Sequence, residues 1–325
     1  MKAIIYTEYG SPDVLRLVDM EKPTPKANEV LVKVHAASAN PLDWHLMRGE
    51  PFLARLDNGL RKPKNSRLGA DLAGVVESVG SEVRQFQPGD AVFGENFQGG
   101  LGSFAEYVTV PESVLAHKPN NLSFESAAAI PVAAYTALQG MRNKGQIRAG
   151  QKVLVNGASG GVGTFAVQIA KALGTEVTGV CSTRNLDLVR SLGADHVVDY
   201  TQDDFTRSQQ KYDLIFDAVG NRSVAELRRA LAPGGVAAIA GFINMRLVFG
   251  HMLIGPLTSK FSNKTVGMME TAHSDKDDLL FLKELVEAGQ VKPVIDRCYE
   301  LAEVAEAIRY LETSRARGKV AITIA

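Results

Sequence analysis

The chain has 325 residues, more than one typical domain holds, so we expect two domains. Lys plus Arg and Asp plus Glu number 36 each, which leaves no basic field of the kind that binds nucleic acid or an anionic membrane. The two cysteines, Cys181 and Cys298, form neither a disulfide framework nor a zinc-ligand spacing. Leu247–Leu257 is too short for a membrane span, and the N-terminus lacks a secretory signal. We therefore expect a soluble, cytoplasmic protein.

The chain up to about Asn120 is predicted to be rich in β-strands. Short apolar or β-branched runs alternate there with turns rich in Gly, Pro and Asp. The predicted strands are Ala3–Tyr6, Glu29–Ala36, Asp71–Val79, Ala91–Phe93 and Ala105–Val110. From Ser123, which can cap a helix, a long helical stretch is expected to about Asn143.

Strands and helices alternate in the next part of the chain. The predicted strands are Val153–Val155, Val177–Val180, His196–Asp199, Tyr212–Phe216 and Gly235–Ala240, and the predicted helices are Val162–Leu173, Leu186–Leu192 and Ser223–Leu231. This alternation is typical of an α/β fold, a parallel sheet wrapped by right-handed crossovers.

The C-terminal part is expected to return to the N-terminal domain. Its predicted elements are a helix over Asp275–Ala288, a strand over Val291–Tyr299, a helix over Leu301–Thr313 and a strand over Lys319–Ile324. The predicted domains are therefore residues 1–122 with 293–325, and residues 123–292.

The run Lys152–Gly163, KVLVNGASGGVG, combines a buried strand, a glycine-rich turn and the start of a helix. Small residues in such a turn let the backbone approach a pyrophosphate, and the helix N-terminus offers free N–H groups. The spacing G-x-x-G-x-x-G departs from the usual G-x-G-x-x-G, so a turn that binds nothing stays an alternative. The predicted dinucleotide contacts are Ala158, Ser159, Gly160, Gly161, Val162 and Gly163.

The residues after the second strand, Glu176–Val180, favour NADP(H) over NAD(H). NAD-binding units place an Asp or Glu there to hold the ribose 2′-hydroxyl, whereas this chain has Ser182, Thr183 and Arg184. A guanidinium and hydroxyl donors suit a 2′-phosphate, which a carboxylate would repel. In the alternative reading, Ser182 and Thr183 only cap the next helix and Arg184 is solvated.

Several motifs in order resemble the medium-chain dehydrogenase/reductase superfamily, in its zinc-independent quinone oxidoreductase branch. They include MKAIIYTEYGSPDVL, NPLDW, GADLAGVVESVG, QPGDAVFG, IPVAAYTAL, NGASGGVG, LGADHVVDY, DLIFDAVG, LAPGGVAAIAG and GKVAI. CSTRN followed by LVRSLGADHVVDY is similar to the subgroup that includes the reticulon-4-interacting protein. The resemblance implies a GroES-like, β-rich catalytic domain, a Rossmann domain with a doubly wound parallel sheet, an active-site cleft between them, and homodimers paired through the Rossmann sheets.

The resemblance also implies that no metal is bound. Asn40 stands about where the zinc-dependent branch has its first Cys, Ala70 and Asp71 replace its His-Glu pair, and Val132 replaces its second Cys. Asp71 alone cannot hold zinc. Without a Lewis acid an alcohol is a poor hydride donor, so a quinone or an α,β-unsaturated carbonyl is the expected small-molecule substrate.

In relatives, Asn40, Asp43 and Trp44 come from a segment that lines the cleft. Asn40 is a candidate to orient the acceptor or the nicotinamide carboxamide, and Trp44 to form a wall. Asp43 is a candidate orienting acceptor if its pKa is ordinary, or a loop cap facing solvent. His45 is the one histidine to test as a proton relay.

The resemblance adds further cofactor contacts. Val219 and Gly220, and then Gly241 and Phe242, follow two strands at the carboxyl edge of the sheet, where ligands bind. The remaining candidates each have a structural alternative: Thr136 (helix packing), Tyr200 (a core aromatic) and Lys319 (a surface lysine). Residues 242–261 are a lid over an apolar substrate or a subunit interface.

The sequence therefore predicts an NADPH-dependent, zinc-independent reductase of quinones or enones. Two alternatives stay open at this point: a non-catalytic NADPH-binding sensor or partner module, and a zinc-free alcohol dehydrogenase.

Overall fold

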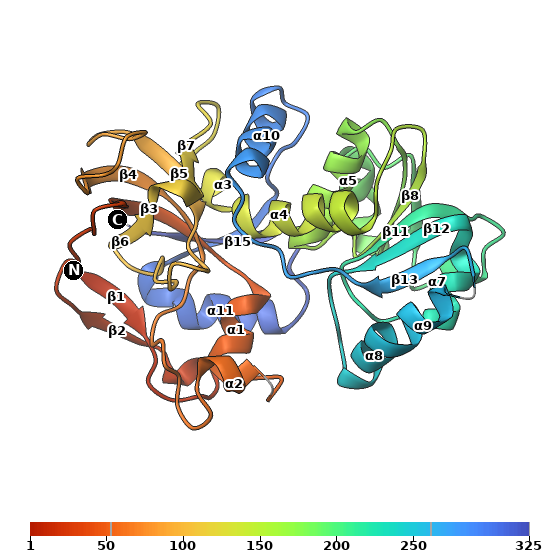
Figure 1. Ribbon diagram of the computed structural model, residues 1–325, viewed down its shortest axis with the longest axis horizontal. Helices are drawn as coiled ribbons and strands as arrows, with labels where there is room; N and C mark the ends of the chain where they lie inside the picture. Colours follow the sequence, from red (N-terminus) through yellow and green to blue (C-terminus); the bar gives the residue numbers. More distant parts are fainter. Residues whose placement is uncertain (53, 261, 325) are drawn as a thin grey trace. The chain divides into compact units, whose positions relative to one another are not determined.

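The computed structural model describes residues 1–52, 54–260 and 262–324, which form two compact units. The first unit contains Met1–Ala133, His273–Glu287 and Pro293–Ala325, and the second contains Ala134–Ala272 and Ala288–Lys292. Both chain ends lie in the first unit (Figure 1). None of the described helices is long and apolar enough to cross a membrane.

The first unit is built on antiparallel strands. Its larger sheet has the order β14-β15-β3-β4-β5-β7, and β6 also pairs with β3. Strands β1 and β2 form a separate two-stranded sheet. The strands are β1 (Lys2–Ile5), β2 (Arg16–Asp19), β3 (Glu29–Ala39), β4 (Asp71–Val79), β5 (Ala91–Glu95), β6 (Tyr107–Pro111), β7 (Leu115–His117), β14 (Ile295–Glu300) and β15 (Lys319–Thr323).

The returning C-terminal strand completes the first unit, as the sequence predicts. Strand β15 runs antiparallel to β3, with Val320 opposite Ala39 and Thr323 opposite Ala36. Both strands are almost wholly buried because each has sheet neighbours on both sides and apolar packing around it. The core of the unit therefore joins residues from both ends of the chain, among them Val30, Leu72, Val320 and Ile322.

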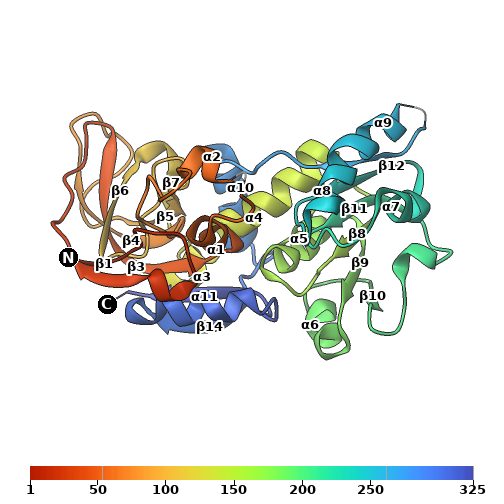
Figure 2. The same cartoon turned by 90° about the horizontal axis from the view of Figure 1, so that it is seen from below.

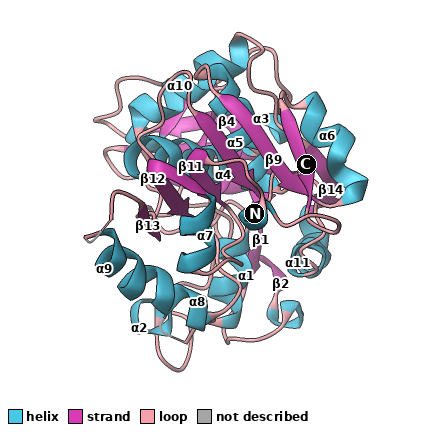
Figure 3. Ribbon diagram, turned by 90° about the vertical axis from the view of Figure 1, so that its right-hand side faces the viewer, coloured by secondary structure: helices cyan, strands magenta, loops and turns pink. Residues whose placement is uncertain are grey.

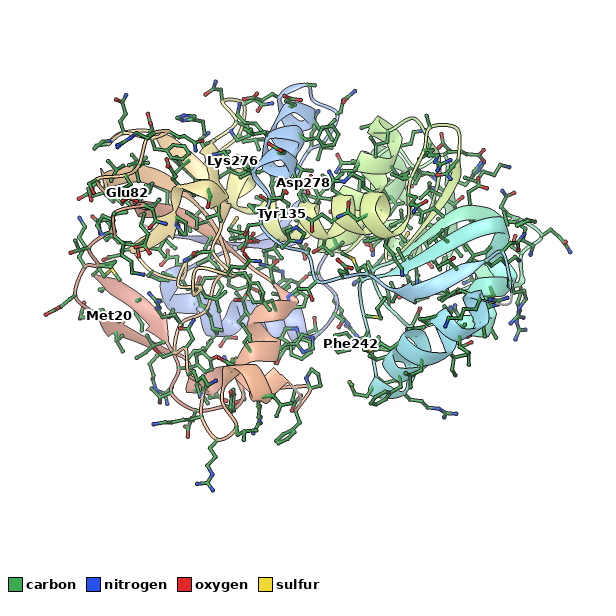
Figure 4. All side chains as sticks on the ribbon, viewed as in Figure 1. Met20, Glu82, Tyr135, Phe242, Lys276 and Asp278 are labelled. Carbon is green, nitrogen blue, oxygen red and sulfur yellow. The ribbon has the colours of Figure 1, made fainter. Side chains whose placement is uncertain are left out.

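The α-helices that the described residues form in the first unit are α1 (Pro41–Arg48), α2 (Ala54–Asn58), α3 (Phe124–Ala128), α10 (Lys276–Glu287) and α11 (Val304–Glu312). Helix α10 lies outside the predicted extent of this domain, which resumes only at residue 293. Lys276, in the first turn of α10 (Figure 4), donates to the carbonyl oxygen of Leu115 in β7, and Ser274 donates to the carboxylate of Glu95. These bonds explain why the segment groups with the β-rich unit.

The second unit contains a six-stranded parallel sheet. Its strand order is β10-β9-β8-β11-β12-β13, and all of these pairs are parallel. The chain first adds strands on one side of β8 and then, from β11 on, adds strands on the other side, so the sheet is doubly wound as predicted. The strands are β8 (Lys152–Asn156), β9 (Glu176–Cys181), β10 (His196–Asp199), β11 (Tyr212–Asp217), β12 (Leu231–Ile239) and β13 (Thr265–Met268). The apolar runs of the central strands are buried because helices cover both faces of the sheet (Figure 3).

Helix α5 (Gly161–Ala172) covers one face of this sheet and α7 (Val224–Ala230) the other (Figure 1). Helix α6 (Leu186–Ser191) lies against β9 and β10 (Figure 2). The predicted helix from Ser123 to Asn143 is instead divided into α3, α4 (Pro131–Gln139) and a π-helical turn over Gly140–Lys144. The break falls at Pro131, which begins α4, because proline is accepted in the first turn of a helix and not inside one.

The segment after β12 forms structure that the sequence analysis did not resolve. Residues 245–259 are helical, as α8 (Met245–Phe249), a π-helical turn over Gly250–Ile254 and α9 (Gly255–Ser259), and β13 follows. Residue 261, the end of the stretch considered as a lid or interface, lies outside the described residues. The exposed side chains of this segment are mostly apolar, notably Met252, Leu253 and Leu257.

Candidate active site

The glycine-rich turn lies between β8 and α5, where the sequence predicts it. Gly157 has φ +85°, and a Cβ on Gly163 would lie 2.0 Å from the carbonyl oxygen of Gly157. Only glycine therefore fits at Gly163 without moving the turn. Gly160 caps α5 and has no side chain to occupy the first-turn N–H groups. This geometry leaves the helix N-terminus able to bind an anionic group.

Two serines from different loops come together beside this turn. Ser159, inside the turn, and Ser182, at the end of β9, are both half-buried. The Nδ2 of Asn185 donates to both hydroxyl oxygens, over 2.9 Å to Ser159 and 3.3 Å to Ser182. Sequence reasoning did not select Asn185, although it follows directly in the CSTRN motif.

Ser182 stands at the cap of a 3-10 turn, Thr183–Asn185, but its side chain makes no capping hydrogen bond. The alternative that its hydroxyl only serves as a helix cap is therefore wrong. The Thr183 hydroxyl is used elsewhere, because it donates to Asp199 Oδ2 over 2.5 Å. Arg184 in the same turn is exposed.

Asp199, at the end of β10, is a carboxylate near this region that the sequence analysis passed over. The hydrogen bond from Thr183 is the main cause that lowers its pKa, and the backbone N–H of Thr201 also donates to it. Tyr200, the next residue, is 57% exposed, so the alternative that it is a core aromatic is wrong. Cys181 is buried as expected, and burial raises the pKa of its thiol to about 11.

The turns after β11 and β12 touch at the same edge of the sheet. A Cβ on Gly220 would lie 2.1 Å from the carbonyl oxygen of Gly241, and Gly220 has φ +68°. Asp217, fully buried at the end of β11, holds the first turn, because its Oδ1 accepts the backbone N–H of Val219 over 3.0 Å and of Gly220 over 2.9 Å. The final Asp in DLIFD was the available sequence signal for this anchor.

Phe242 and Thr136 are the other two predicted cofactor contacts of the second unit. Phe242 is 37% exposed in the segment that leads into α8 (Figure 4). Thr136 is half-buried on α4 and follows Tyr135, which is buried. The roles of both residues at the nicotinamide stay predictions.

In the first unit, Asn40 belongs to a buried polar cluster with Ser38, Asp71 and Lys319. Asp71 Oδ2 accepts from the Ser38 hydroxyl over 2.5 Å, from Asn40 Nδ2 over 2.9 Å and from Lys319 Nζ over 3.2 Å. The Lys319 ammonium also donates to Asn40 Oδ1 over 2.5 Å. Lys319 is 3% exposed, so the alternative that it is a surface lysine is wrong.

Asp43 lies in the first turn of α1 and is fully buried, so the alternative of a solvent-facing loop cap is wrong. Its two oxygens accept the backbone N–H groups of Asn40 over 2.8 Å and Gly69 over 2.9 Å. Burial outweighs these bonds and raises the pKa of Asp43 to about 7, so the condition of an ordinary pKa, on which the role of orienting acceptor depended, is not met. Asp43 therefore holds the backbone at the start of α1, and its role in the reaction stays a prediction.

Trp44 and His45 follow on the same helix. The Trp44 ring is half-buried against the core of the first unit, and its centroid lies 3.6 Å from that of the His45 ring. His45 Nδ1 is 2.7 Å from the carbonyl oxygen of Glu50, and burial lowers the pKa of this imidazole. The neutral imidazole is favoured as a result, so near pH 7 little of His45 is in the protonated form that could donate a proton as an imidazolium.

Comparisons with known proteins identify the family. Residues 26–120 match the alcohol dehydrogenase GroES-like domain, and residues 192–322 match the family described as zinc-binding dehydrogenase. The chain is 37% identical over 333 residues to 2-methylene-furan-3-one reductase of Solanum lycopersicum, covering 99% of this chain and 79% of that protein. This chain belongs to the medium-chain dehydrogenase/reductase superfamily. Its place is in the branch of quinone oxidoreductases and alkenal/one reductases.

Other members of this superfamily align over nearly the whole chain. NADPH-dependent alkenal/one oxidoreductase, chloroplastic, of Arabidopsis thaliana is 36% identical, covering 99% of this chain and 79% of that protein. NAD(P)H oxidoreductase RTN4IP1, mitochondrial, of Mus musculus is 34% identical, covering 100% and 89%. Among solved structures, the quinone oxidoreductase of Coxiella burnetii superposes with a TM-score of 0.87 at 32% identity, covering 100% of this chain and 99% of that chain. The predicted fold and family are confirmed.

The family description raises the question of zinc, and the residues present do not fit that metal. Among the described residues, no group of three or more His, Cys, Asp or Glu side chains is placed to hold a metal ion. Asp71 already accepts four donors, the fourth being the backbone N–H of Val132 over 2.8 Å. One of those donors is an ammonium group, which would repel a cation.

Proposed function

We propose that this superfamily member is an NADPH-dependent, zinc-independent reductase of quinones or α,β-unsaturated carbonyls. The observation that carries the proposal is a pair of hydroxyls beside the glycine turn of the second unit, those of Ser159 and Ser182. Arg184 lies in the 3-10 turn that follows Ser182 and is exposed. Relatives named as an alkenal/one oxidoreductase and a quinone oxidoreductase support the reaction class.

The preference for NADPH rests on charge. A 2′-phosphate is a dianion near neutral pH, and hydrogen bonds that involve an ionised partner are about twice as strong as neutral ones. The carboxylate of Asp199 opposes this preference, because it places a negative charge beside Thr183. Thr183 and Thr201 donate to its carboxylate, so part of its charge is already compensated within the protein.

The expected acceptor follows from the chemistry available in the first unit. Conjugation makes a carbon of a quinone or enone electrophilic, so reduction needs no metal to activate a hydroxyl. When bound, NADPH supplies the hydride from nicotinamide C4, and a proton from water completes the two-electron reduction. The chain's own residues have to orient the two reactants and exclude water.

Particular residues of each unit are suited to these tasks. The backbone of the glycine turn and the α5 N-terminus bind the pyrophosphate, and the turn fixed by Asp217 presents Val219 and Gly220 to the nicotinamide side. In the first unit, Lys319 and Asp71 fix Asn40, and Asp43 fixes the start of α1, which carries Trp44. Trp44 is the proposed wall for a flat acceptor.

The first experiment follows NADPH oxidation by absorbance over a panel of quinones, enones and enals. We expect turnover with members of this panel and none with simple alcohols plus NADP⁺. Tight NADPH binding without turnover on any acceptor would support the NADPH-binding sensor or partner module instead. Reduction of NADP⁺ by simple alcohols would support a zinc-free alcohol dehydrogenase.

The second experiment tests the cofactor. Arg184→Glu should weaken NADPH binding by ~100-fold and NADH binding much less, because it replaces an attractive charge with a repulsive one near the 2′-phosphate. Arg207→Glu, at another exposed arginine of the second unit, is the matched charge control. Equal losses for NADPH and NADH in Arg184→Glu would remove this residue from the phosphate site.

Subunit pairing and location remain predictions. Strands β10 and β13 are the two edges of the parallel sheet, so a homodimer formed through the Rossmann sheets would use one of them. Two relatives carry mitochondrial or chloroplastic in their names, which leaves the cytoplasmic expectation for this chain to be tested by imaging a tagged protein.

A further inference from the structure

Asn185 joins the two loops that carry the proposed phosphate-binding hydroxyls. Ser159 follows β8 and Ser182 follows β9, so the two residues reach this place from neighbouring strands. One amide nitrogen donates to both of their oxygens, over 2.9 and 3.3 Å. Asn185 is 4% exposed, so its side chain is held by packing and cannot follow a mobile ligand.

The direction of these hydrogen bonds determines what the serines can still do. An amide N–H only donates, so each hydroxyl uses an oxygen lone pair toward Asn185 and keeps its own hydrogen for another acceptor. Within residues 1–52, 54–260 and 262–324, neither hydroxyl hydrogen has a protein acceptor. Two hydroxyl donors near a helix N-terminus suit a ligand with several anionic oxygens.

The other end of the amide shows that this arrangement is not explained by stability. Asn185 Oδ1 is buried and has no hydrogen-bond partner among the described residues. An unpaired buried carbonyl oxygen is destabilising, and a leucine of similar size would avoid that loss. The side chain therefore makes the fold less stable at one end while it orders two hydroxyls at the other.

We infer that Asn185 is a positioning residue for cofactor selectivity, because its Nδ2 turns the hydroxyl hydrogens of Ser159 and Ser182 toward the 2′-phosphate of NADPH. The inference rests on the proposed function, and it assigns the selectivity to a residue that does not itself touch the phosphate. Carboxylate oxygens at this position would reverse the polarity, because they accept from the two hydroxyls and add a negative charge.

The test uses the full chain and two small probes, 2′,5′-ADP and 5′-AMP, with affinities measured by calorimetry. The wild-type protein should prefer 2′,5′-ADP. Asn185→Leu should reduce this preference by ~10-fold and Asn185→Asp by ~100-fold, while the affinity for 5′-AMP changes by less than about 2-fold. Thermal unfolding of Asn185→Leu should occur at or above the wild-type temperature, because the orphaned oxygen is gone. Asn143→Asp, at an exposed asparagine, controls for added charge.

A second background separates ordering of the serines from other effects. In a Ser159→Ala, Ser182→Ala protein, Asn185→Leu should cause no further loss of preference, since there are no hydroxyls left to orient. An unchanged preference in Asn185→Leu, or a parallel loss for both probes, would overturn the inference. A wild-type protein that binds the two probes equally would instead overturn the proposed NADPH preference.

Discussion

The polar groups of the two units are arranged in opposite ways. In the first unit, Ser38, Asn40, Asp71 and Lys319 satisfy one another and are almost wholly shielded from water. In the second unit, Ser159 and Ser182 accept from Asn185 and keep their donor capacity. A closed network stabilises a shape, whereas an open one has capacity left for a ligand. Substitutions in the cluster of the first unit should therefore change mainly stability, and substitutions around the two serines of the second unit should change mainly binding.

Breaking the closed cluster should have the largest effect. Lys319→Met leaves the Asp71 carboxylate buried without its cation, so we expect a loss of about 3–5 kcal/mol in the free energy of unfolding. Asp71→Asn in the same protein should restore part of that loss, because the uncompensated charge is removed. Denaturant titration of the two single variants and the double variant measures the coupling. Strictly additive losses would show that the pair does not act as a unit.

The pH dependence of stability should report on Asp43. The pKa of Asp43 is about 7 in the folded protein, against an ordinary value of 3.8, so the folded state holds a proton that the unfolded state releases. Stability therefore falls as pH rises through this window, by ~3 kcal/mol between pH 5 and pH 8. Urea titrations at both pH values measure it, and Asp43→Asn should flatten that part of the profile. A wild-type profile that rises over this window would contradict the assignment.

Asp217 is an intermediate case, because one of its carboxylate oxygens has hydrogen-bond partners and the other has none among the described residues. Its Oδ1 accepts from Asn156 Nδ2 and two backbone N–H groups, while Oδ2 is buried with no partner among the described residues. Asp217→Leu should release the Val219–Gly220 turn, costing ~1–3 kcal/mol in stability and ~10-fold in KM for NADPH. Far-ultraviolet circular dichroism melting and steady-state kinetics measure the two effects. A variant with wild-type KM would separate this turn from the nicotinamide.

The smallest expected change is a gain. Asp199→Asn removes a negative charge beside Thr183 and keeps an oxygen that can accept a hydrogen bond from the Thr183 hydroxyl. The affinity for NADPH should therefore rise ~2- to 3-fold, while the affinity for NADH stays nearly constant. Asp203→Asn, at an exposed acid two positions beyond the Thr201 contact, is the matched control. Titration of cofactor fluorescence at low salt measures both, and a lower NADPH affinity would show that Asp199 helps to hold the cofactor.

Local patterns in the sequence were sufficient for the parallel sheet and its glycine turn. Strand, turn and helix follow one another within Lys152–Leu173, so short-range chemistry decides the outcome. The contact between Asp71 and Lys319 spans 248 positions, and no local pattern signals it. Asn185 was next to selected residues, but its importance comes from Ser159 on another loop, 26 positions earlier. Burial likewise overrode local expectation at Asp43, whose cap-like position suggested solvent.

The position of strand β15 late in the sequence has a consequence for folding during translation. At roughly 5–20 residues per second, Lys319 is added about 12–50 s after Asp71, because 248 positions separate them. During that interval the β3–β4 pair lacks its neighbouring strand, while every strand of the parallel sheet has already been synthesised by Met268. The parallel sheet of the second unit can therefore form first, and the nascent first unit is the part that a chaperone would have to shield until β15 has been added.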